Sequence, residues 1–255
     1  MAPRIGLQLY SVREALAADF AGTLRQVAAM GYRDVETAFW PEGMTAAEAA
    51  TALRDAGLNV VSAHLPLPDG DAAEVVFRDA EALGTPRVVW HGWPRDPRYD
   101  TLAGVRELAN LFSEAGVAAK AHGFDFAIHN HWWENEATEG TIPYQWFRRE
   151  CDPAVEFELD AYWAKVAGLD PAAVARDLRG RLPLLHLKDG PLSKEAPMSA
   201  LGTGRLDIPA VLAAAGDEPG WVIVELDRVD GDMLAAVRQS RDYLIGLGLD
   251  GSASA

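Results

Sequence analysis

The sequence predicts an α/β protein that folds as a single (β/α)8 TIM barrel. Short runs of β-branched and aliphatic residues, which are typical of buried strands, alternate with amphipathic helical segments along the chain. This two-part unit occurs eight times in 255 residues, at about 30 residues per unit, and eight such units close a parallel sheet into a barrel. Residues 1–247 are expected to form the barrel, and residues 248–255, which are small and polar, a disordered tail.

The expected strands are runs of about four to six mainly apolar residues, most of which end at a polar side chain. In chain order they are residues 5–10, 34–37, 59–64, 87–91, 124–130, 155–160, 182–187 and 222–226. Because parallel strands buried on both faces read as continuous apolar runs, these segments favour strands in the interior of an α/β protein.

The expected helices carry apolar residues three and four positions apart, as Leu24, Val27 and Ala28 do in the first of them. In chain order they are residues 19–31, 45–57, 71–83, 102–121, 144–150, 171–178, 208–215 and 233–245. Local signals support the boundaries, since Gly31 and Gly57 end the first two helices, and Asp170 precedes Pro171 as a cap before a first-turn proline. The helices therefore separate the strands at the spacing that a barrel requires.

Composition restricts the class of protein. The formal net charge of −15 disfavours nucleic acid as a partner, because such binding draws its affinity from Lys and Arg. Cys151 is the only cysteine, so no intramolecular disulfide forms. The chain has no secretory leader pattern and no apolar stretch of eighteen residues, so we expect a soluble cytoplasmic protein without a membrane partner, with a homo-oligomer as an open possibility.

Metal-binding side chains end most of the expected strands. The histidines at such ends are His64, His91, His129, His131 and His186, five of the six in the chain, and the carboxylates are Glu158, Asp160 and Glu225. In a barrel the carboxyl ends of all strands meet at one rim, where the active site lies. Imidazole and carboxylate together suit zinc, manganese or iron better than calcium. A single histidine at a strand end is more often structural, but five of six indicate a metal site.

Strand alternation decides which of these side chains can share the barrel interior. Residues i and i+2 face the same side of a strand, so His129 and His131 can both point inward. The same holds for Glu158 with Asp160 and for His186 with Lys188.

Five motifs resemble the sugar phosphate isomerase/epimerase family, a xylose-isomerase-like barrel group. They are residues 128–134 (IHNHWWE), 158–163 (ELDAYW), 185–189 (LHLKD), 202–207 (GTGRLD) and 224–227 (VELD). The resemblance spans nearly the whole chain and falls on the branch of the family that carries His-Asn-His. It implies one divalent metal ion, Mn, Zn, Co or Mg, held by one residue from each of strands five to eight.

The resemblance assigns three ligands directly and leaves the fourth open. Asp160, His186 and Glu225 match the family's ligands of strands six to eight, while the glutamate position of strand five falls on His129. We assign His129 as the fourth ligand, with His131 and Glu134 as alternatives.

Such a site supports isomerisation or epimerisation of a sugar or keto-sugar through an enediolate, because a divalent ion stabilises the charge left after a proton next to a carbonyl is removed. Glu225 is the expected base as well as a ligand, and His129 or His131 could move the second proton, with His131 as the assigned catalytic residue. Lys188 is expected to act as an acid or electrophile, with an ordinary salt bridge to a neighbouring carboxylate as the alternative.

The expected substrate is a sugar or polyol. Tryptophans follow several strands, and aromatic rings suit the C–H faces of sugar rings. The expected substrate-binding residues are Gln8, Glu36, His64, Trp133 and Trp163. Two other functions remain open: a dehydratase or lyase that acts on a keto-inositol or a 3-keto-glycoside, and a non-catalytic sugar-binding barrel.

Overall fold

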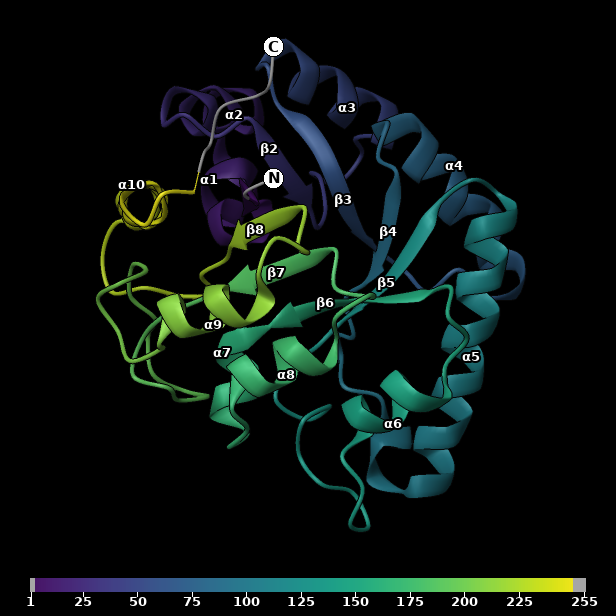
Figure 1. Ribbon diagram of the computed structural model, residues 1–255. Coiled ribbons are helices and arrows are strands. Elements are labelled where there is room, and N and C mark those ends of the chain that lie inside the picture. Colours follow the sequence, from purple (N-terminus) through teal and green to yellow (C-terminus); the bar gives the residue numbers. More distant parts are fainter. Residues whose placement is uncertain (1–2, 250–255) are drawn as a thin grey trace.

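A computed structural model, which describes residues 3–249, has eight parallel strands closed into a barrel and surrounded by helices (Figure 1). The strands pair in chain order, and β8 pairs with β1. They are β1 Arg4–Gln8, β2 Asp34–Thr37, β3 Asn59–Leu65, β4 Arg87–Trp90, β5 Asp125–His129, β6 Val155–Asp160, β7 Leu184–Leu187 and β8 Trp221–Val224. The predicted single (β/α)8 barrel is confirmed.

Ten α-helices and three 3-10 helices connect the strands within residues 3–249. The α-helices are α1 Arg13–Ala18, α2 Phe20–Ala29, α3 Ala46–Asp55, α4 Ala73–Leu83, α5 Leu102–Ala121, α6 Pro143–Glu150, α7 Ala161–Val166, α8 Pro171–Asp177, α9 Ile208–Ala215 and α10 Met233–Gly246. The 3-10 helices are η1 Leu9–Val12, η2 Gly70–Ala72 and η3 Pro97–Asp100. No helix in this part of the chain has both the length and the apolar composition to cross a membrane.

The strands and helices depart from the sequence prediction mainly at their ends. The first strand stops at Gln8 rather than at residue 10, because Gln8 caps η1 by accepting a hydrogen bond from the Tyr10 N–H. Two short helices, α1 and α7, lack a predicted counterpart. Each has six residues, and in α1 only Leu16 is buried, so α1 has no repeating apolar face for a sequence pattern to reveal.

The barrel interior is built in two layers. A small apolar cluster lies inside the strands and consists of Val89, Ala127, Leu184 and Ile223. A polar residue follows each of these apolar residues two positions later along the chain. These polar residues are His91, His129, His186 and Glu225, in the same order. Because residues i and i+2 face the same side of a strand, the apolar layer supports a polar layer directly above it, at the carboxyl ends of the strands.

The carboxyl end of the chain was expected to form a tail from residue 248. Residues 250–255 lie outside the described part of the chain. Within the described part, Leu249 is buried, and its N–H donates a hydrogen bond to the Leu244 carbonyl.

The loop between β7 and α9 is anchored by one buried carboxylate. Asp189 accepts backbone hydrogen bonds from Gly190, Gly202, Gly204 and Leu206 at 2.8–3.0 Å. A side-chain carboxylate can satisfy four N–H groups of an irregular segment in this way, and the loop it anchors passes over the carboxyl end of the barrel.

We predict that Asp189→Ala lowers the free energy of unfolding by about 3 kcal/mol, because four N–H groups lose their acceptor and those of Gly190 and Leu206 are buried. Chemical denaturation measures this directly. Asp207→Ala is the control, because Asp207 caps α9 on the same loop through one exposed hydrogen bond to the Ala210 N–H and should cost only about 1 kcal/mol. Equal losses in the two variants would contradict the anchoring role.

Candidate metal centre

The carboxyl ends of β5 to β8 bring four metal-binding side chains together. Ligand atoms of His129, Asp160, His186 and Glu225, all buried, lie within 4.8 Å of one another. The strand register explains part of this proximity, because Asp160 of β6 is paired with His186 of β7. We call these four residues the outer quartet. They are the set that the sequence analysis assigned to the metal.

The Asp160 carboxylate has a fixed orientation within this quartet. Its Oδ1 accepts a hydrogen bond of 2.8 Å from the Trp163 N–H and so caps α7. Its Oδ2 is buried and accepts no hydrogen bond from the described residues, although Lys188 Nζ lies 3.4 Å away. Burial raises the pKa of Asp160 to about 7, against the opposing effect of the Lys188 charge. The free oxygen of Asp160 is therefore available to a cation.

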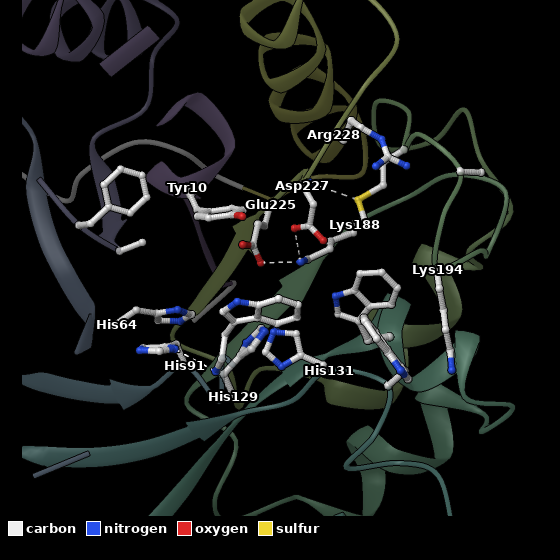
Figure 2. A pocket seen from close by; sticks show the side chains of 17 residues that line it. Tyr10, His64, His91, His129, His131, Lys188, Lys194, Glu225, Asp227 and Arg228 are labelled. Atoms are coloured by element: carbon white, nitrogen blue, oxygen red, sulfur yellow. Dashed lines mark hydrogen bonds and ion pairs between the residues drawn. The ribbon is translucent and has the colours of Figure 1, made fainter. Parts of the chain in front are cut away.

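Lys188 lies among three carboxylates at the edge of the quartet. Its ammonium is 2.6 Å from Asp227 and 2.9 Å from Glu225. Figure 2 marks both contacts with dashed lines. Burial alone would lower the pKa of Lys188, but these carboxylates raise it well above its usual value. Burial would likewise raise the pKa of Glu225, yet the Lys188 ammonium and the hydrogen bond between Glu225 and His186 hold it well below its usual range. Lys188 is thus an ammonium and Glu225 a carboxylate at neutral pH.

Two further carboxylates lie behind the quartet, on the side away from solvent. Glu158 Oε2 is 2.9 Å from His129 Nδ1 and 2.7 Å from His64 Nε2. Glu36 Oε1 is 2.8 Å from His186 Nε2 and 3.0 Å from His64 Nε2. Burial disfavours charge on His64, but Glu36 and Glu158 raise its pKa to about 10. His64 therefore carries the positive charge that compensates these two buried carboxylates.

A second set of potential metal ligands overlaps the first. His64, His129, Glu158 and His186 also hold ligand atoms within 4.8 Å of one another, and we call them the inner quartet. His129 and His186 belong to both quartets. Glu158 has no exposed surface, and neither has Asp160 of the outer quartet, so both quartets are buried.

A pocket of about 390 Å³ opens onto this end of the barrel. Of the residues assigned from sequence, it is lined by His64, His129, His131, Trp163, Lys188 and Glu225 (Figure 2). The other residues assigned from sequence are buried and do not line the pocket. They are Gln8, Glu36, Trp133, Asp160 and His186. A volume of this size suits a small organic ligand.

The buried residues outside the lining set support those that reach the pocket. Gln8 Nε2 donates a hydrogen bond of 2.6 Å to Glu36. The Trp133 ring stacks on the His131 ring, with their centroids 4.2 Å apart. Burial and the Lys188 charge lower the pKa of His131 well below its usual value, so His131 is a neutral imidazole beside the pocket.

The structure adds lining residues that the sequence analysis did not assign. These are Tyr10, Ala38, Phe39, Trp93, Trp132, Lys194, Ala196, Met198, Asp227 and Arg228, together with His91. Most of them follow the strands or lie on loops, where no periodicity fixes the direction of a side chain. Glu158, by contrast, carries a sequence signal, because it stands two positions before Asp160 on the same strand and faces the same side.

The outer quartet fits a divalent cation. Two imidazoles and two carboxylates form the mixed nitrogen and oxygen set that zinc, manganese and iron accept. The buried Asp160 Oδ2, which has no hydrogen bond from the described residues, is the further observation that favours an ion here.

Glu134, the third alternative for the fourth ligand, is held away from the outer quartet. Its Oε2 accepts a hydrogen bond of 2.8 Å from the His131 N–H, and it belongs to neither quartet. Burial raises the pKa of Glu134 to about 8. This carboxyl group is therefore largely protonated at neutral pH.

Comparison with known proteins gives a consistent result. A model of the xylose isomerase-like TIM barrel family matches residues 24–247. A sugar phosphate isomerase/epimerase from Parabacteroides distasonis has 25% sequence identity and a TM-score of 0.77, over 95% of this chain and 98% of that chain. The family resemblance predicted from the motifs is confirmed. No curated protein matches the sequence.

More distant solved structures share the fold. L-ribulose 3-epimerase is 19% identical, with a TM-score of 0.71, over 97% of this chain and 94% of that chain. A probable 3-DHS dehydratase from Bacillus anthracis is 14% identical, also with a TM-score of 0.71, over 95% of this chain and 98% of that chain. The same barrel therefore occurs in proteins described as an epimerase and as a dehydratase.

We predict that Glu134→Gln stabilises the protein at pH 8 but not at pH 5. The pKa of Glu134 rises from 4.5 to about 8 on folding, so the wild type loses stability as pH rises between these values, whereas glutamine stays neutral. The gain in free energy of unfolding should reach about 2–4 kcal/mol, measured by denaturation at both pH values. The control is Glu139→Gln, at an exposed position in the same loop, which should show no comparable gain. A gain of equal size at both pH values would contradict this prediction.

Proposed function

The chain belongs to the xylose isomerase-like TIM barrel family, and we propose that it is a divalent-metal-dependent isomerase or epimerase of a sugar or keto-sugar. The observation that carries the proposal is the outer quartet, with four buried ligand atoms within 4.8 Å at the inner end of a pocket. His129, Asp160, His186 and Glu225 would hold the ion. When bound, a divalent ion supplies stabilisation of the negative charge that develops on a carbonyl oxygen as a neighbouring proton is lost.

The side chains around the pocket supply the proton transfers. Glu225 is a carboxylate that lines the pocket and can accept a proton from a carbon next to a carbonyl. His131 is a neutral imidazole that lines the same pocket, and its buried Nδ1 has no hydrogen-bond partner among the described residues. Proton removal by one group and return by the other would invert or move a substrate stereocentre through an enediolate.

Lys188 is the acid of this arrangement. Its ammonium lines the pocket and is held by Glu225 and Asp227. It can donate a hydrogen bond to a substrate oxygen on which charge develops, or release a proton to that oxygen. The ion pairs that hold Lys188 also fix its direction, so the salt-bridge role and the catalytic role are compatible.

A dehydratase or lyase is the second candidate, and the mouth of the pocket favours it. Tyr10, Phe39 and Trp93 line the pocket and are unusually exposed for large aromatic residues, at 37%, 42% and 57%. A monosaccharide at the inner end would leave these rings uncovered, whereas a glycoside would cover them with its second group. Removal of the same proton followed by loss of that group, protonated by Lys188, would give elimination.

We predict that Asp160→Ala, His186→Ala and Glu225→Ala each abolish tight metal binding, because a site with three of its four ligands is open and poorly shaped. Elemental analysis should find about one ion per wild-type chain, and calorimetry should follow the loss. His129→Ala should weaken binding, whereas His131→Ala should retain the ion and lower turnover.

His122→Ala is the control, because His122 is exposed at the end of α5. Metal retained in His129→Ala and lost in His131→Ala would reverse the two assignments, and full occupancy after all three alanine changes would refute the site.

We predict that the metal-loaded protein incorporates solvent deuterium into a keto-sugar or keto-inositol in heavy water, because both reactions begin with proton removal next to a carbonyl. Mass spectrometry then separates the two reactions. An isomer keeps the substrate mass apart from exchange, whereas loss of water or of an aglycone identifies elimination. Protein treated with a chelator is the control and should exchange nothing. Absence of exchange and turnover across a broad panel would favour the non-catalytic sugar-binding barrel.

A further inference from the structure

The overlap of the two quartets limits how metal can bind. His129 and His186 belong to both quartets, but a neutral imidazole has only one nitrogen with a free lone pair. Neither histidine can therefore ligate an ion on each side without also losing its ring N–H proton. The outer and inner quartets are alternatives, so the barrel holds one ion in either of two places.

In each of the two shared histidines, His129 and His186, the two ring nitrogens face different neighbours. The Nδ1 of His129 faces Glu158 Oε2 at 2.9 Å, which leaves its Nε2 without a hydrogen bond from the described residues. The Nδ1 of His186 faces Glu225 Oε2 at 2.9 Å, while its Nε2 faces Glu36 Oε1 at 2.8 Å. Each shared histidine thus has one nitrogen toward the outer quartet or the pocket and the other toward a buried carboxylate.

The carboxylates distinguish the two sides. Glu36 and Glu158 have no exposed surface, and neither of them lines the pocket, whereas Glu225 of the outer quartet does line it. The pocket is also lined by His64 and by the shared His129, so an ion that enters from the pocket meets a lining carboxylate only in the outer quartet. Glu36 already has partners, because it accepts hydrogen bonds from Gln8 and Ser62 in addition to its contacts with histidine. Glu158 contacts His64 and His129 through Oε2, while its buried Oε1 lies 3.2 Å from His186 Nε2 and accepts no hydrogen bond from the described residues.

We propose that Glu158 is a positioning residue, which accepts the Nδ1–H of His129 and thereby turns the His129 Nε2 lone pair toward an ion in the outer quartet. Glu36 does the same for His186 through its Nε2–H. Carboxylates that accept the distal N–H of a ligating histidine fix its tautomer and its ring orientation. His64 lies between the two carboxylates, 2.7 Å from Glu158 and 3.0 Å from Glu36, and joins them into one support. The inference rests on the proposed metal site and assigns the inner quartet as its support.

Metal titration of Glu158→Gln tests this role. Glutamine keeps the size of the side chain, but its amide group can donate to His129 Nδ1 and so favour the wrong tautomer. With Co²⁺ or Zn²⁺ as the probe, we expect one ion per chain in both proteins and an affinity about 10–100-fold lower in the variant. Glu156→Gln is the matched control, because Glu156 lies on the same strand but binds Arg87, and it should stay within about twofold of the wild type.

A measurement on the wild type makes the test independent of variant stability. In the Zn²⁺-loaded protein, long-range ¹H–¹⁵N spectra of the histidine rings should find the His129 proton on Nδ1. A proton on Nε2 would overturn the proposal even if Glu158→Gln failed to fold. A variant that binds metal as tightly as the wild type would also overturn it.

The remaining outcomes separate this proposal from the proposed function. Two ions in the wild type and one in Glu158→Gln would make the inner quartet a second metal site. An ion kept by Asp160→Ala but lost by Glu158→Gln would place the only ion there. Either result overturns the positioning role while leaving the protein metal-dependent. A wild type that binds no ion would refute the metal-dependent function and the positioning role together.

Discussion

Charge compensation inside the barrel is the constraint on which the site depends. Unpaired buried carboxylates are costly, because the barrel interior replaces water with a medium of low polarity. Glu36 and Glu158 are compensated by His64 and by the N–H groups of the shared histidines, while Glu225 is compensated by Lys188. The outer quartet lies between these two compensated groups and contains two carboxylates and two imidazoles. The proposed divalent cation would add positive charge between these groups.

The sequence was sufficient for the fold because the pattern repeats. Eight apolar runs and eight amphipathic segments all indicate the same repeating unit, so small errors in the predicted ends of helices and strands left the predicted topology unchanged. These errors in the predicted ends have local causes. Helix α7 begins directly after Asp160, which is at once the end of β6 and the cap of the helix, so no loop signal separates the two. The seventh strand begins only after Pro183, whose ring nitrogen carries no proton for a sheet hydrogen bond.

The candidate site was predictable only where strands position it. Alternation and barrel closure brought the histidines and carboxylates of β5 to β8 to one rim, as the structure has them. The alternation of side chains along a strand tells which side chains point inward but not how far each lies below the rim of the barrel. It therefore could not predict that His64 lines the pocket while Gln8 and Glu36 lie beneath it. Lys194 and Arg228 lie on irregular segments that follow β7 and β8. Their approach to the pocket depends on loop paths, which in turn depend on anchors such as Asp189.

The double use of Asp160 has a consequence for the proposed metal site. One carboxylate oxygen accepts a hydrogen bond from the Trp163 N–H at the start of α7, and this bond holds the side chain in its rotamer. Binding of an ion would therefore cost little conformational entropy at this ligand, and its release would leave the helix capped. In many small zinc domains the chain is unfolded without its metal. In this barrel a backbone hydrogen bond orients Asp160, so the proposed site would not depend on its ion to hold this ligand in place.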